Sequence, residues 1–406
     1  METINQGDPV LWVKQHNLFW AFFCLAGVGL TTLAVVKPRS VAVLAAAAVI
    51  GLTYKFFLRK PAVIDRMVTE VQAGALLIWL SYALIRSLET RKPKWFMISG
   101  LIIGALALTK AMFLYVGIGL ILTLLVVYLP GRRKGEVWYF VKLMGIMIIS
   151  TAVIMMPWII RNRIQLRVWK NTQRGGQILF IRATKNQMNE TEYAGAFYYY
   201  APPALKSKIG DYLGFSNEDL QEGGVLQRLN RNDNTAFADS DKKAEREGRP
   251  EDAVSFYRSA KAEYISLRIY FEEQGAENPS LLADQTLQRR AINMILDDPV
   301  KHLKTTLVFL WRGMWVNIPF AINLAGFLAI WGMALWGLHR KNTQMIGIAV
   351  PSIGVLAFHA LLTHNIPRYS LIILPNVMVA IVVLCCWCAV YLAGRAANIA
   401  GCKQPV

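Results

Sequence analysis

A single lysine interrupts a long apolar stretch of the sequence. Lys110 lies in LALTKAMFLYV, with apolar residues on both sides over positions 95–129. An ionisable side chain inside a hydrocarbon-compatible segment is costly, so it marks a candidate functional site. We interpret the Lys110 ammonium as a cation that binds the phosphate of a lipid. The structural alternative is a lysine at a helix end, whose long stem lets its ammonium reach the membrane surface.

Two further groups of polar residues stand where apolar runs end. Arg161 and Arg163 follow one run in MMPWIIRNRIQLR, and His364, Arg368 and Tyr369 precede another in THNIPRYSLIIL. A guanidinium is planar and permanently charged, so it suits bidentate binding of a phosphate. We therefore predict that these residues bind a phosphate. For the two arginines of the first group, contact with lipid headgroups is the alternative.

Acidic residues near these apolar runs are few. Asp65 and Glu70 occur in AVIDRMVTEVQ, and Glu70 already lies inside an apolar run. We interpret both as candidate catalytic residues, because a carboxylate there can act as a general base or bind a metal ion. The structural alternative is an ion pair with Arg66 or another basic neighbour. No His, Cys or acidic residues have the spacing of a metal site, so no metal ligand is predicted, and a requirement for a divalent cation stays open.

The composition indicates which elements must position these side chains. Of the 406 residues, 55% are hydrophobic and 17% are charged, and the mean hydropathy is +0.36. Soluble proteins have roughly 25% charged residues, so the sequence predicts an all-α polytopic membrane protein. One span needs about 20 apolar residues. Nine spans are predicted: 17–36, 40–58, 67–88, two short helices within 95–129 that meet near position 110, 137–160, 319–338, 344–362 and 370–394.

A polar segment separates the sixth predicted span from the seventh. Residues 161–300 contain 20 basic and 20 acidic residues, so the formal net charge of +18 belongs to the rest of the chain. This distribution excludes a nucleic-acid-binding protein and is typical of basic loops that flank spans. We predict a membrane bundle at 1–160, a soluble domain at 161–300, an interfacial helix at 301–318 and further spans at 319–406.

Helix signals within the polar segment are uneven. Residues 250–273 and 282–295 have helix-forming composition or near-helical apolar spacing, and Asp298-Pro299 is typical of a helix start. The residues after it predict an amphipathic helix on the membrane surface. Residues 175–234 are rich in Gly, Asn and Tyr, and we predict irregular structure there. The domain as a whole is predicted to be mainly helical.

Basic residues in the short loops predict the orientation. The loops at 86–94 and 130–136, the segment 339–341 and the C-terminal tail all contain Lys or Arg. Because such loops stay on the cytoplasmic side, residues 161–300 are predicted to be extracytoplasmic and the C-terminus cytoplasmic. Nine spans then place the N-terminus outside, and we interpret this as the absence of one preceding helix from the chain.

Five stretches, in order along the chain, resemble one enzyme superfamily. They are RMVTEVQAGALLIWL, SGLIIGALALTKAMF, MMPWIIRNRIQ with QRGGQILF after it, RRAINMILDDPVKHLKTTLVFLWRGMW and IPRYSLIILPNVMVAIVVL, and the match covers about residues 67–393. The chain resembles the membrane glycosyltransferases of the GT-C fold that use polyprenyl-phosphate sugars. That group includes bacterial protein mannosyltransferase-like enzymes and the aminoarabinose transferase of lipid A. Each motif alone is weak, and their shared order makes the resemblance specific.

The resemblance implies a glycosyltransferase of the bacterial plasma membrane. Such an enzyme transfers a sugar from a polyprenyl-phosphate donor to a lipid, glycan or protein acceptor outside the cytoplasm. Lys110, Arg161 and Arg368 would hold the phosphate of the leaving group. The aromatic run at 193–200 would stack on sugar rings, and a groove between apolar helices would take the isoprenoid tail.

In the family, a catalytic acidic residue lies in the first external loop, directly after the first helix. In this sequence only Glu2 and Asp8 precede the first predicted span. The resemblance therefore implies that this helix and its loop are missing from the chain. We expect such a chain to bind polyprenyl phosphate and to transfer little sugar by itself.

Two other classes of protein remain as alternatives. A transporter or flippase of lipid-linked sugars would also need many membrane helices. Such folds usually contain repeats with broken helices in both halves, whereas here one large polar segment divides the chain asymmetrically. A protein of the O-antigen ligase or polymerase type would also pair an arginine-rich outer loop with lipid-linked sugars, but it lacks the five motifs in this order.

Overall fold

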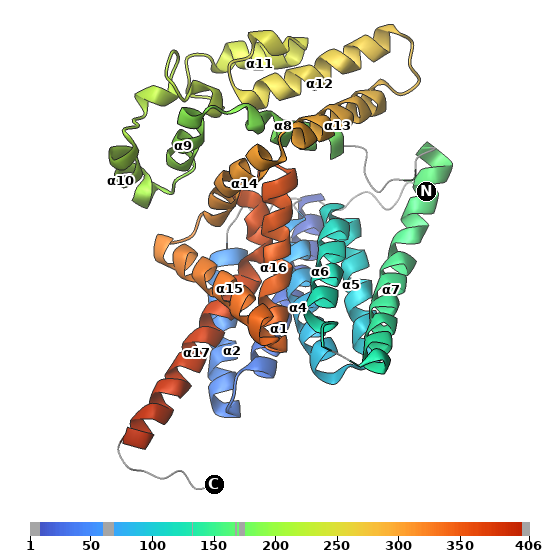
Figure 1. The fold of residues 1–406 in the computed structure, drawn as a ribbon, viewed down its shortest axis with the longest axis vertical. Helices are drawn as coiled ribbons and strands as arrows, with labels where there is room; N and C mark the ends of the chain where they lie inside the picture. Colours follow the sequence, from blue (N-terminus) through green and yellow to red (C-terminus); the bar gives the residue numbers. More distant parts are fainter. Residues whose placement is uncertain (1–8, 60–68, 132, 167–168, 170–174, 400–406) are drawn as a thin grey trace. The chain divides into compact units, whose positions relative to one another are not determined.

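The computed structural model describes residues 9–59, 69–131, 133–166, 169 and 175–399, and the regular structure of these residues is helical (Figure 1). Contacts within the chain divide it into two compact units. Unit 1 comprises Met1–Trp169, Ala321–Val355 and Arg368–Val406, and unit 2 comprises Lys170–Phe320 and Leu356–Pro367. The large polar segment of the sequence is therefore the main part of unit 2.

Apolar helices make up unit 1. In chain order they are α1 (Pro9–Val35), α2 (Arg39–Thr53), the π-helix η1 (Tyr54–Leu58), α4 (Glu70–Thr90), α5 (Pro93–Thr109), α6 (Met112–Tyr128), α7 (Lys134–Leu166), α15 (Phe320–Arg340), most of α16 (Thr343–Leu362), most of the 3₁₀ helix η6 (Pro367–Ile373) and α17 (Leu374–Ile399). Among the described residues, seven helical segments are long and apolar enough to cross a membrane, and α5 and α6 are shorter apolar helices. A helical multi-pass membrane protein is thus confirmed, with seven full-length candidates where nine spans were predicted.

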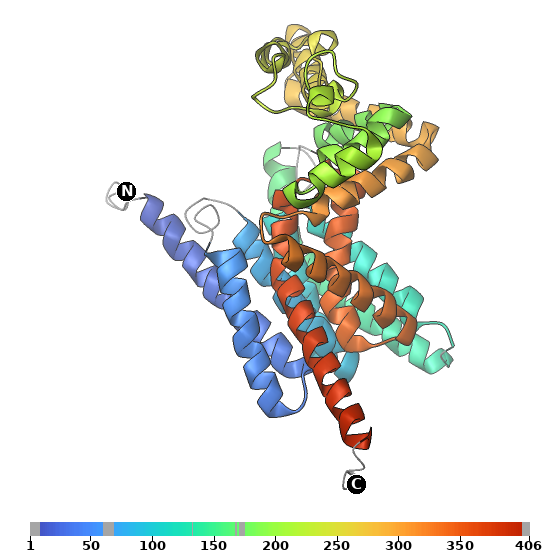
Figure 2. The ribbon, with the colours of Figure 1, turned by 90° about the vertical axis from the view of Figure 1, so that its left-hand side faces the viewer.

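Helix α4 forms the centre of unit 1. Of its apolar window, 78% is buried inside the protein, and α1, α5 and α17 pack against it. A buried amide joins α17, α4 and α16. Asn376 of α17 donates to Ser81 Oγ of α4 at 2.7 Å and to the Ile348 carbonyl of α16 at 3.0 Å. Figure 2 shows α1, α2 and α17 side by side. This packing holds the first turn of α4 close to the start of α17.

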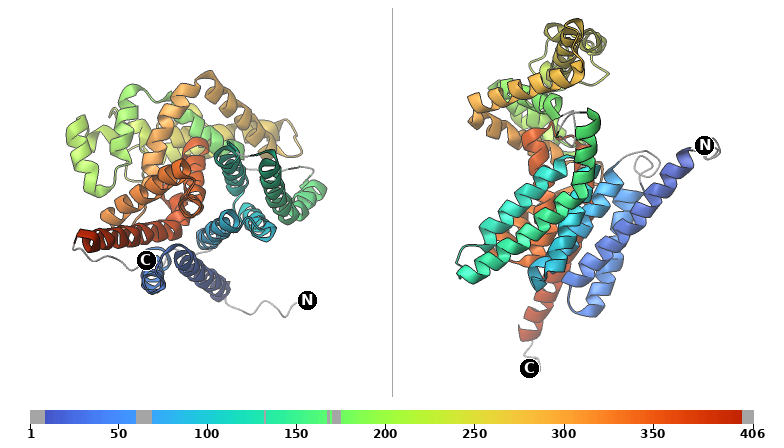
Figure 3. Two further views of the ribbon diagram at one scale, coloured as in Figure 1. Left: turned by 60° about the horizontal axis from the view of Figure 1, so that its bottom comes forward. Right: turned by 90° about the vertical axis from the view of Figure 1, so that its right-hand side faces the viewer.

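Helices α5, α6 and α7 form a second layer of unit 1 (Figure 3). A β-carbon on Gly100 of α5 would lie 2.2 Å from the Met147 carbonyl of α7, so only glycine permits this close approach. At 1.5 Å per residue, the 17 residues of α5 extend about 25 Å, less than the roughly 30 Å hydrocarbon core. The prediction that two short helices meet near Lys110 is confirmed.

Unit 2 consists of shorter helices. They are α8 (Gly175–Ala183), η2 (Thr184–Gln187), α9 (Glu190–Tyr199), α10 (Pro203–Leu213), η3 (Glu218–Leu220), η4 (Gln227–Leu229), α11 (Ala238–Glu247), η5 (Pro250–Asp252), α12 (Phe256–Glu273), α13 (Pro279–Asp297) and α14 (Pro299–Met314). Helix α13 packs against α8 and α12, and α11 packs against α12. The prediction of a mainly helical domain is confirmed.

The prediction of irregular structure at 175–234 is wrong for its first part. Three α-helices, α8, α9 and α10, occupy much of 175–213. The first two begin at hydrogen-bonded caps. Asp284 of α13 accepts hydrogen bonds from the first amides of α8, at Gly176 and Gln177, at 3.0 and 2.9 Å. Asn189 and Glu192 form a capping box at the start of α9. From 214 to 237 the chain does consist of turns and short 3₁₀ helices.

The predicted helix start at Asp298-Pro299 is confirmed. Asp298 Oδ1 accepts a hydrogen bond from the Lys301 amide at 2.8 Å, and Pro299 is the first residue of α14. His302, Thr305 and Thr306 lie on the buried face of α14, whereas Val300, Leu303 and Leu307 lie on its exposed face. These polar and apolar residues thus lie on different faces, and the helix is amphipathic as predicted. Its location on a membrane surface stays a prediction.

Candidate functional site

Three ionisable residues of the sequence analysis meet in unit 1. Glu70 is the first residue of α4, and Lys110 joins α5 to α6. Arg368 lies in η6, which leads directly into α17. The fold therefore brings together residues that are up to 298 positions apart.

The carboxylate of Glu70 is the common acceptor of this group. Lys110 Nζ donates to Glu70 Oε1 at 3.0 Å. Arg368 donates to both carboxylate oxygens, from Nε to Oε1 at 2.9 Å and from Nη2 to Oε2 at 3.3 Å. Lys110 Nζ also lies 5.8 Å from the centre of the Tyr369 ring. We call these four residues, Glu70, Lys110, Arg368 and Tyr369, the Glu70 cluster.

Burial differs sharply within the Glu70 cluster. The Glu70 side chain is 2% exposed, that of Lys110 is 19% exposed, and that of Arg368 is 56% exposed. A buried carboxylate is stable only when it is paired and hydrogen-bonded, and the two cations provide this. Arg368 uses two of its three nitrogens on Glu70 and keeps solvent access. The cluster is therefore an anchored cationic surface and not a closed ion pair.

The local backbone at Lys110 explains how its side chain reaches Glu70. Lys110 adopts an extended conformation, with φ −145° and ψ 119°, between two apolar helices. Its amide still donates to the Leu106 carbonyl at 2.8 Å, and its carbonyl accepts from the Phe113 amide at 3.0 Å. The break is thus hydrogen-bonded on both sides, as backbone at membrane depth requires.

The other predicted phosphate-binding residues have different neighbours. Arg161 of α7 lies 4.7 Å from the Trp158 ring and contacts Asn162, and Arg163 lies 5.7 Å from the Trp169 ring. These contacts lie on α7 and at Trp169. Both arginines remain candidates for phosphate or headgroup contact on α7.

His364 belongs to unit 2. Its carbonyl accepts from Arg312 Nη1 at 2.9 Å, and its ring lies 5.8 Å from that of Tyr257. Burial, together with the positive charges of Arg312, Arg231 and Lys185, lowers the pKa of His364 to about 2. A histidine in this environment is neutral, so it cannot supply a positive charge to a phosphate.

Asp65, the second predicted catalytic residue, lies outside the described residues, as do Arg66, Glu2 and Asp8. The structural alternative for Glu70 is an ion pair with a basic neighbour. Among the described residues, its partners are Lys110 and Arg368, which are both distant from it in sequence. In the described part of the chain, no group of three or more His, Cys, Asp or Glu residues could hold a metal ion. The Glu70 cluster itself has a single carboxylate.

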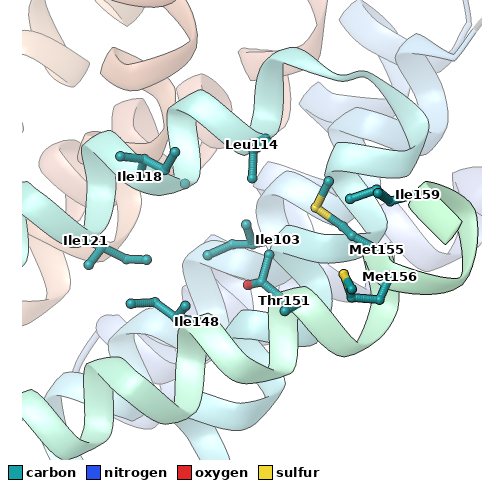
Figure 4. Close-up of a pocket in the computed structure, with 11 residues that line it drawn as sticks. Ile103, Leu114, Ile118, Ile121, Ile148, Thr151, Met155, Met156 and Ile159 are labelled. Atoms are coloured by element: carbon teal, nitrogen blue, oxygen red, sulfur yellow. The ribbon is translucent and has the colours of Figure 1, made fainter. Parts of the chain in front are cut away.

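An apolar cavity lies between α5, α6 and α7 (Figure 4). Its volume is about 310 Å³, and its lining includes Ile103, Leu114, Ile148 and Met155. The hydroxyl of Thr151, which also lines it, donates to the Gly100 and Met147 carbonyls and offers no free donor. Leu114 is four residues after Lys110, so α6 connects this cavity to the Glu70 cluster. The resemblance implies a groove between apolar helices, and no pattern in the sequence identifies the residues that line this cavity.

The aromatic run at 193–200 faces mostly inward. Tyr198 is 4% exposed, and Tyr193, Phe197, Tyr199 and Tyr200 pack against the same hydrophobic core of unit 2. These rings also hold cations, since Lys304 lies 4.6 Å from the Tyr193 ring. Stacking on sugars stays a prediction, and packing is what the described contacts show.

No family model, no curated protein and no solved structure matches the chain.

Proposed function

We propose that the chain is a membrane glycosyltransferase of the GT-C type, which binds the phosphate of a polyprenyl-phosphate sugar at the Glu70 cluster. The observation that carries this proposal is the convergence of Lys110 and Arg368 on one buried carboxylate. A phosphate needs cations that are fixed in place yet accessible. Arg368 is anchored through two nitrogens and remains 56% exposed.

In this reaction the phosphate is the leaving group. The acceptor hydroxyl oxygen forms a bond to C1 of the sugar, and the bond between C1 and the phosphate oxygen breaks. The electron pair of that bond stays on the phosphate, where nearby fixed cations stabilise the developing charge. Lys110 and Arg368 would supply them, and the hydroxyl proton leaves to a base, for which Asp65 is the candidate.

Glu70 takes a different role from the catalytic one predicted. Its two oxygens already accept hydrogen bonds from Lys110 and Arg368, so their lone pairs are directed at cations. We assign Glu70 as a positioning residue that fixes both cations before the phosphate arrives. Such preorganisation avoids reorientation during the reaction.

The cavity between α5, α6 and α7 supports the choice of a lipid-linked donor. It is lined almost wholly by apolar side chains, and its volume of about 310 Å³ lies at the lower end of the range of small-molecule sites. Water-soluble sugar nucleotides would gain nothing from it. We therefore propose that the first isoprene units lie against α6 and the phosphate at Lys110.

The proposed orientation places unit 2 outside the cytoplasm, in a bacterial plasma membrane. It rests on the basic loops at 86–94 and 130–136. A reporter that is active only outside the cytoplasm should be active when fused after Asn234 and silent when fused after Arg133. The reverse pattern would overturn this orientation.

The test of the proposed function uses the full chain in lipid nanodiscs with a synthetic polyprenyl phosphate. Binding is followed by native mass spectrometry, and transfer by the release of labelled sugar from the corresponding donor. We expect Arg368→Gln to weaken lipid binding about tenfold or more, as the loss of a hydrogen bond to a charged group does. Arg368→Lys should retain part of the binding, because it keeps the charge but loses the bidentate geometry.

Arg340→Gln is the matched control. Arg340 is an exposed arginine of α15 in the same unit, and its ring contact is Trp336 at 5.0 Å. It should bind the lipid as the unaltered chain does. Equal lipid affinity in Arg340→Gln and Arg368→Gln would show that the Glu70 cluster only holds helices together.

A further inference from the structure

A lysine of unit 2 is buried without an ion pair among the described residues. Lys185 of η2 is 3% exposed, and its ammonium lies 4.5 Å from the centre of the Phe256 ring. Within the described residues, the structure records no hydrogen bond or ion pair of this ammonium. Burial of a charge costs free energy unless a partner compensates it.

Arg182, one turn earlier, shows that unit 2 can compensate a buried cation. It is fully buried, and its guanidinium donates to the Ala360 carbonyl at 2.8 Å, to Asn186 at 3.2 Å and to the His302 carbonyl at 3.1 Å. Thr305 and Thr306 accept further hydrogen bonds from it. The fold itself therefore satisfies Arg182, and Lys185 differs from it in kind.

Three arginines surround Lys185 instead of acceptors. Arg228 lies 4.1 Å from the centre of the Phe256 ring that also contacts Lys185. Arg231 lies 4.3 Å from the ring of the next residue, Tyr257. These cations rest on the faces of two neighbouring aromatic residues at the start of α12, which fixes their positions without neutralising them.

The third arginine comes from the end of α14. Arg312 lies 4.3 Å from the Tyr200 ring and donates to the His364 carbonyl at 2.9 Å. The three arginines are partly exposed, whereas Lys185 is buried. An anion from solvent would thus meet the guanidinium groups first and the ammonium at the base of the group.

Among the described residues, Glu192 is the carboxylate that acts on Lys185. It already accepts from the Asn189 amide at 3.0 Å and lies 3.5 Å from Arg228. Burial and the positive charges of Arg312 and Arg231 outweigh it, so the pKa of Lys185 is held well below its usual value. Positive charge is therefore in excess, and a bound anion would relieve it.

We propose that Lys185, Arg228, Arg231 and Arg312 form a binding site in unit 2 for a phosphoryl group, such as that of a phosphate monoester. The excess of positive charge at Lys185 fits a ligand with two negative charges. Arginine matches phosphate oxygens with paired N–H donors, and lysine adds a point charge. A single carboxylate ligand would leave most of these donors unused.

The phosphoryl group can belong to a water-soluble ester or to a lipid headgroup, since the chemistry of recognition is the same. Two arms of one experiment separate these sources. The full chain is placed in phosphatidylcholine nanodiscs and titrated with inorganic phosphate at constant ionic strength. In the second arm, part of the phosphatidylcholine is replaced by phosphatidic acid, and no phosphate is added.

Hydrogen–deuterium exchange of peptides that cover 184–200 and 226–232 is the readout, because it reports on unit 2 alone. We expect slower, saturable exchange in at least one arm. Lys185→Met and Arg231→Gln should each weaken the apparent affinity about tenfold or more, as the loss of a hydrogen bond to a charged group does. Arg231 is partly exposed, so its variant tests the site even if Lys185→Met alters the packing.

Lys206→Met is the matched control. Lys206 lies 5.1 Å from the Tyr198 ring, and burial alone is the cause of the lowered pKa of its ammonium. It thus shares the ring contact of Lys185 without the surrounding arginines, and its variant should protect as the unaltered chain does. The absence of protection in both arms, or equal affinity of Lys185→Met and Lys206→Met, would overturn the proposal. Since only unit 2 peptides are scored, failure of lipid binding at the Glu70 cluster does not affect this result.

Discussion

The two units of this protein treat buried charge in opposite ways. In unit 1 the buried group is an anion, Glu70, and two more exposed cations meet on it within 3.3 Å. In unit 2 the buried group is a cation, Lys185, and it is surrounded by further cations that rest on aromatic rings. The first arrangement is internally compensated, whereas in the second the charge of Glu192 is outweighed by burial and by the surrounding cations.

This difference separates structural from ligand-dependent stabilisation. Removal of the Glu70 charge leaves Lys110 and Arg368 without their shared acceptor, so unit 1 should lose stability. Removal of the Lys185 charge relieves a repulsion, so unit 2 should gain stability while it loses ligand binding. The sign of the change in stability therefore distinguishes the two arrangements.

The largest effect is expected for Glu70→Gln. Loss of one partner of a buried ion pair costs about 3–5 kcal/mol, because the remaining charges stay uncompensated. Hydrogen–deuterium exchange of peptides from the first turns of α4 and from η6 measures this cost locally. Glu89→Gln is the control on the same helix, since the Glu89–Arg86 pair is partly exposed at 3.5 Å and should contribute less than about 1 kcal/mol. Equal losses in both variants would show that the Glu70 carboxylate is not shared as described.

A smaller effect of opposite sign is expected for Lys185→Met. Replacement of a buried charged group by an apolar residue of similar length should raise the free energy of unfolding of unit 2 by about 1–3 kcal/mol, in phosphate-free buffer. Exchange rates of α8 and η2 peptides report this change. Lys206→Met should stay within about 0.5 kcal/mol of the unaltered chain. A loss of stability in Lys185→Met would mean that its ammonium is compensated in the way that Arg182 is.

The smallest effect concerns acid and His302 of α14. Burial, followed by the charge of Arg182, lowers the pKa of His302 to about 4 from 6.5. Because the folded pKa lies below the unfolded one, the stabilisation is complete above about pH 6.5 and is lost progressively as the pH falls from 6.5 through 4. We expect unit 2 to lose about 1 kcal/mol between pH 7 and pH 5. His302→Gln should flatten this dependence, and an unchanged slope would contradict it.

Local signals in the sequence predicted the elements well but not the pairing of charges. Length and hydropathy located the apolar helices, and the break at Lys110 follows from a run too long for one span. Asp298 followed by proline marked the start of α14, because a cap needs only neighbouring residues. The contact of Glu70 with Arg368 spans 298 positions. It depends on how α4 and α17 pack, which no local pattern encodes.

Two errors have the same physical origin. The segment around α8 looked irregular because its cap, Asp284, lies more than 100 positions away. The sequence also gives no sign that Lys185 is buried, because a lysine in a neutral, polar segment is usually solvated. Its burial follows from the packing of α12 over η2, where Phe256 covers the ammonium. A dense group of arginines at 228 and 231 was the available signal, and without burial it carried little weight.

The tight connection at Lys110 also bears on how the protein is made. Only Lys110 and Ala111 separate α5 from α6, so neither helix has a loop that could remain in water while the other enters the bilayer. The pair thus forms a helical hairpin, with the ammonium at its tip, and translation delivers it 40 residues after Glu70. The carboxylate is therefore already synthesised when the lysine that pairs with it emerges. Arg368, synthesised 298 residues after Glu70, completes the cluster only after α16 has been synthesised.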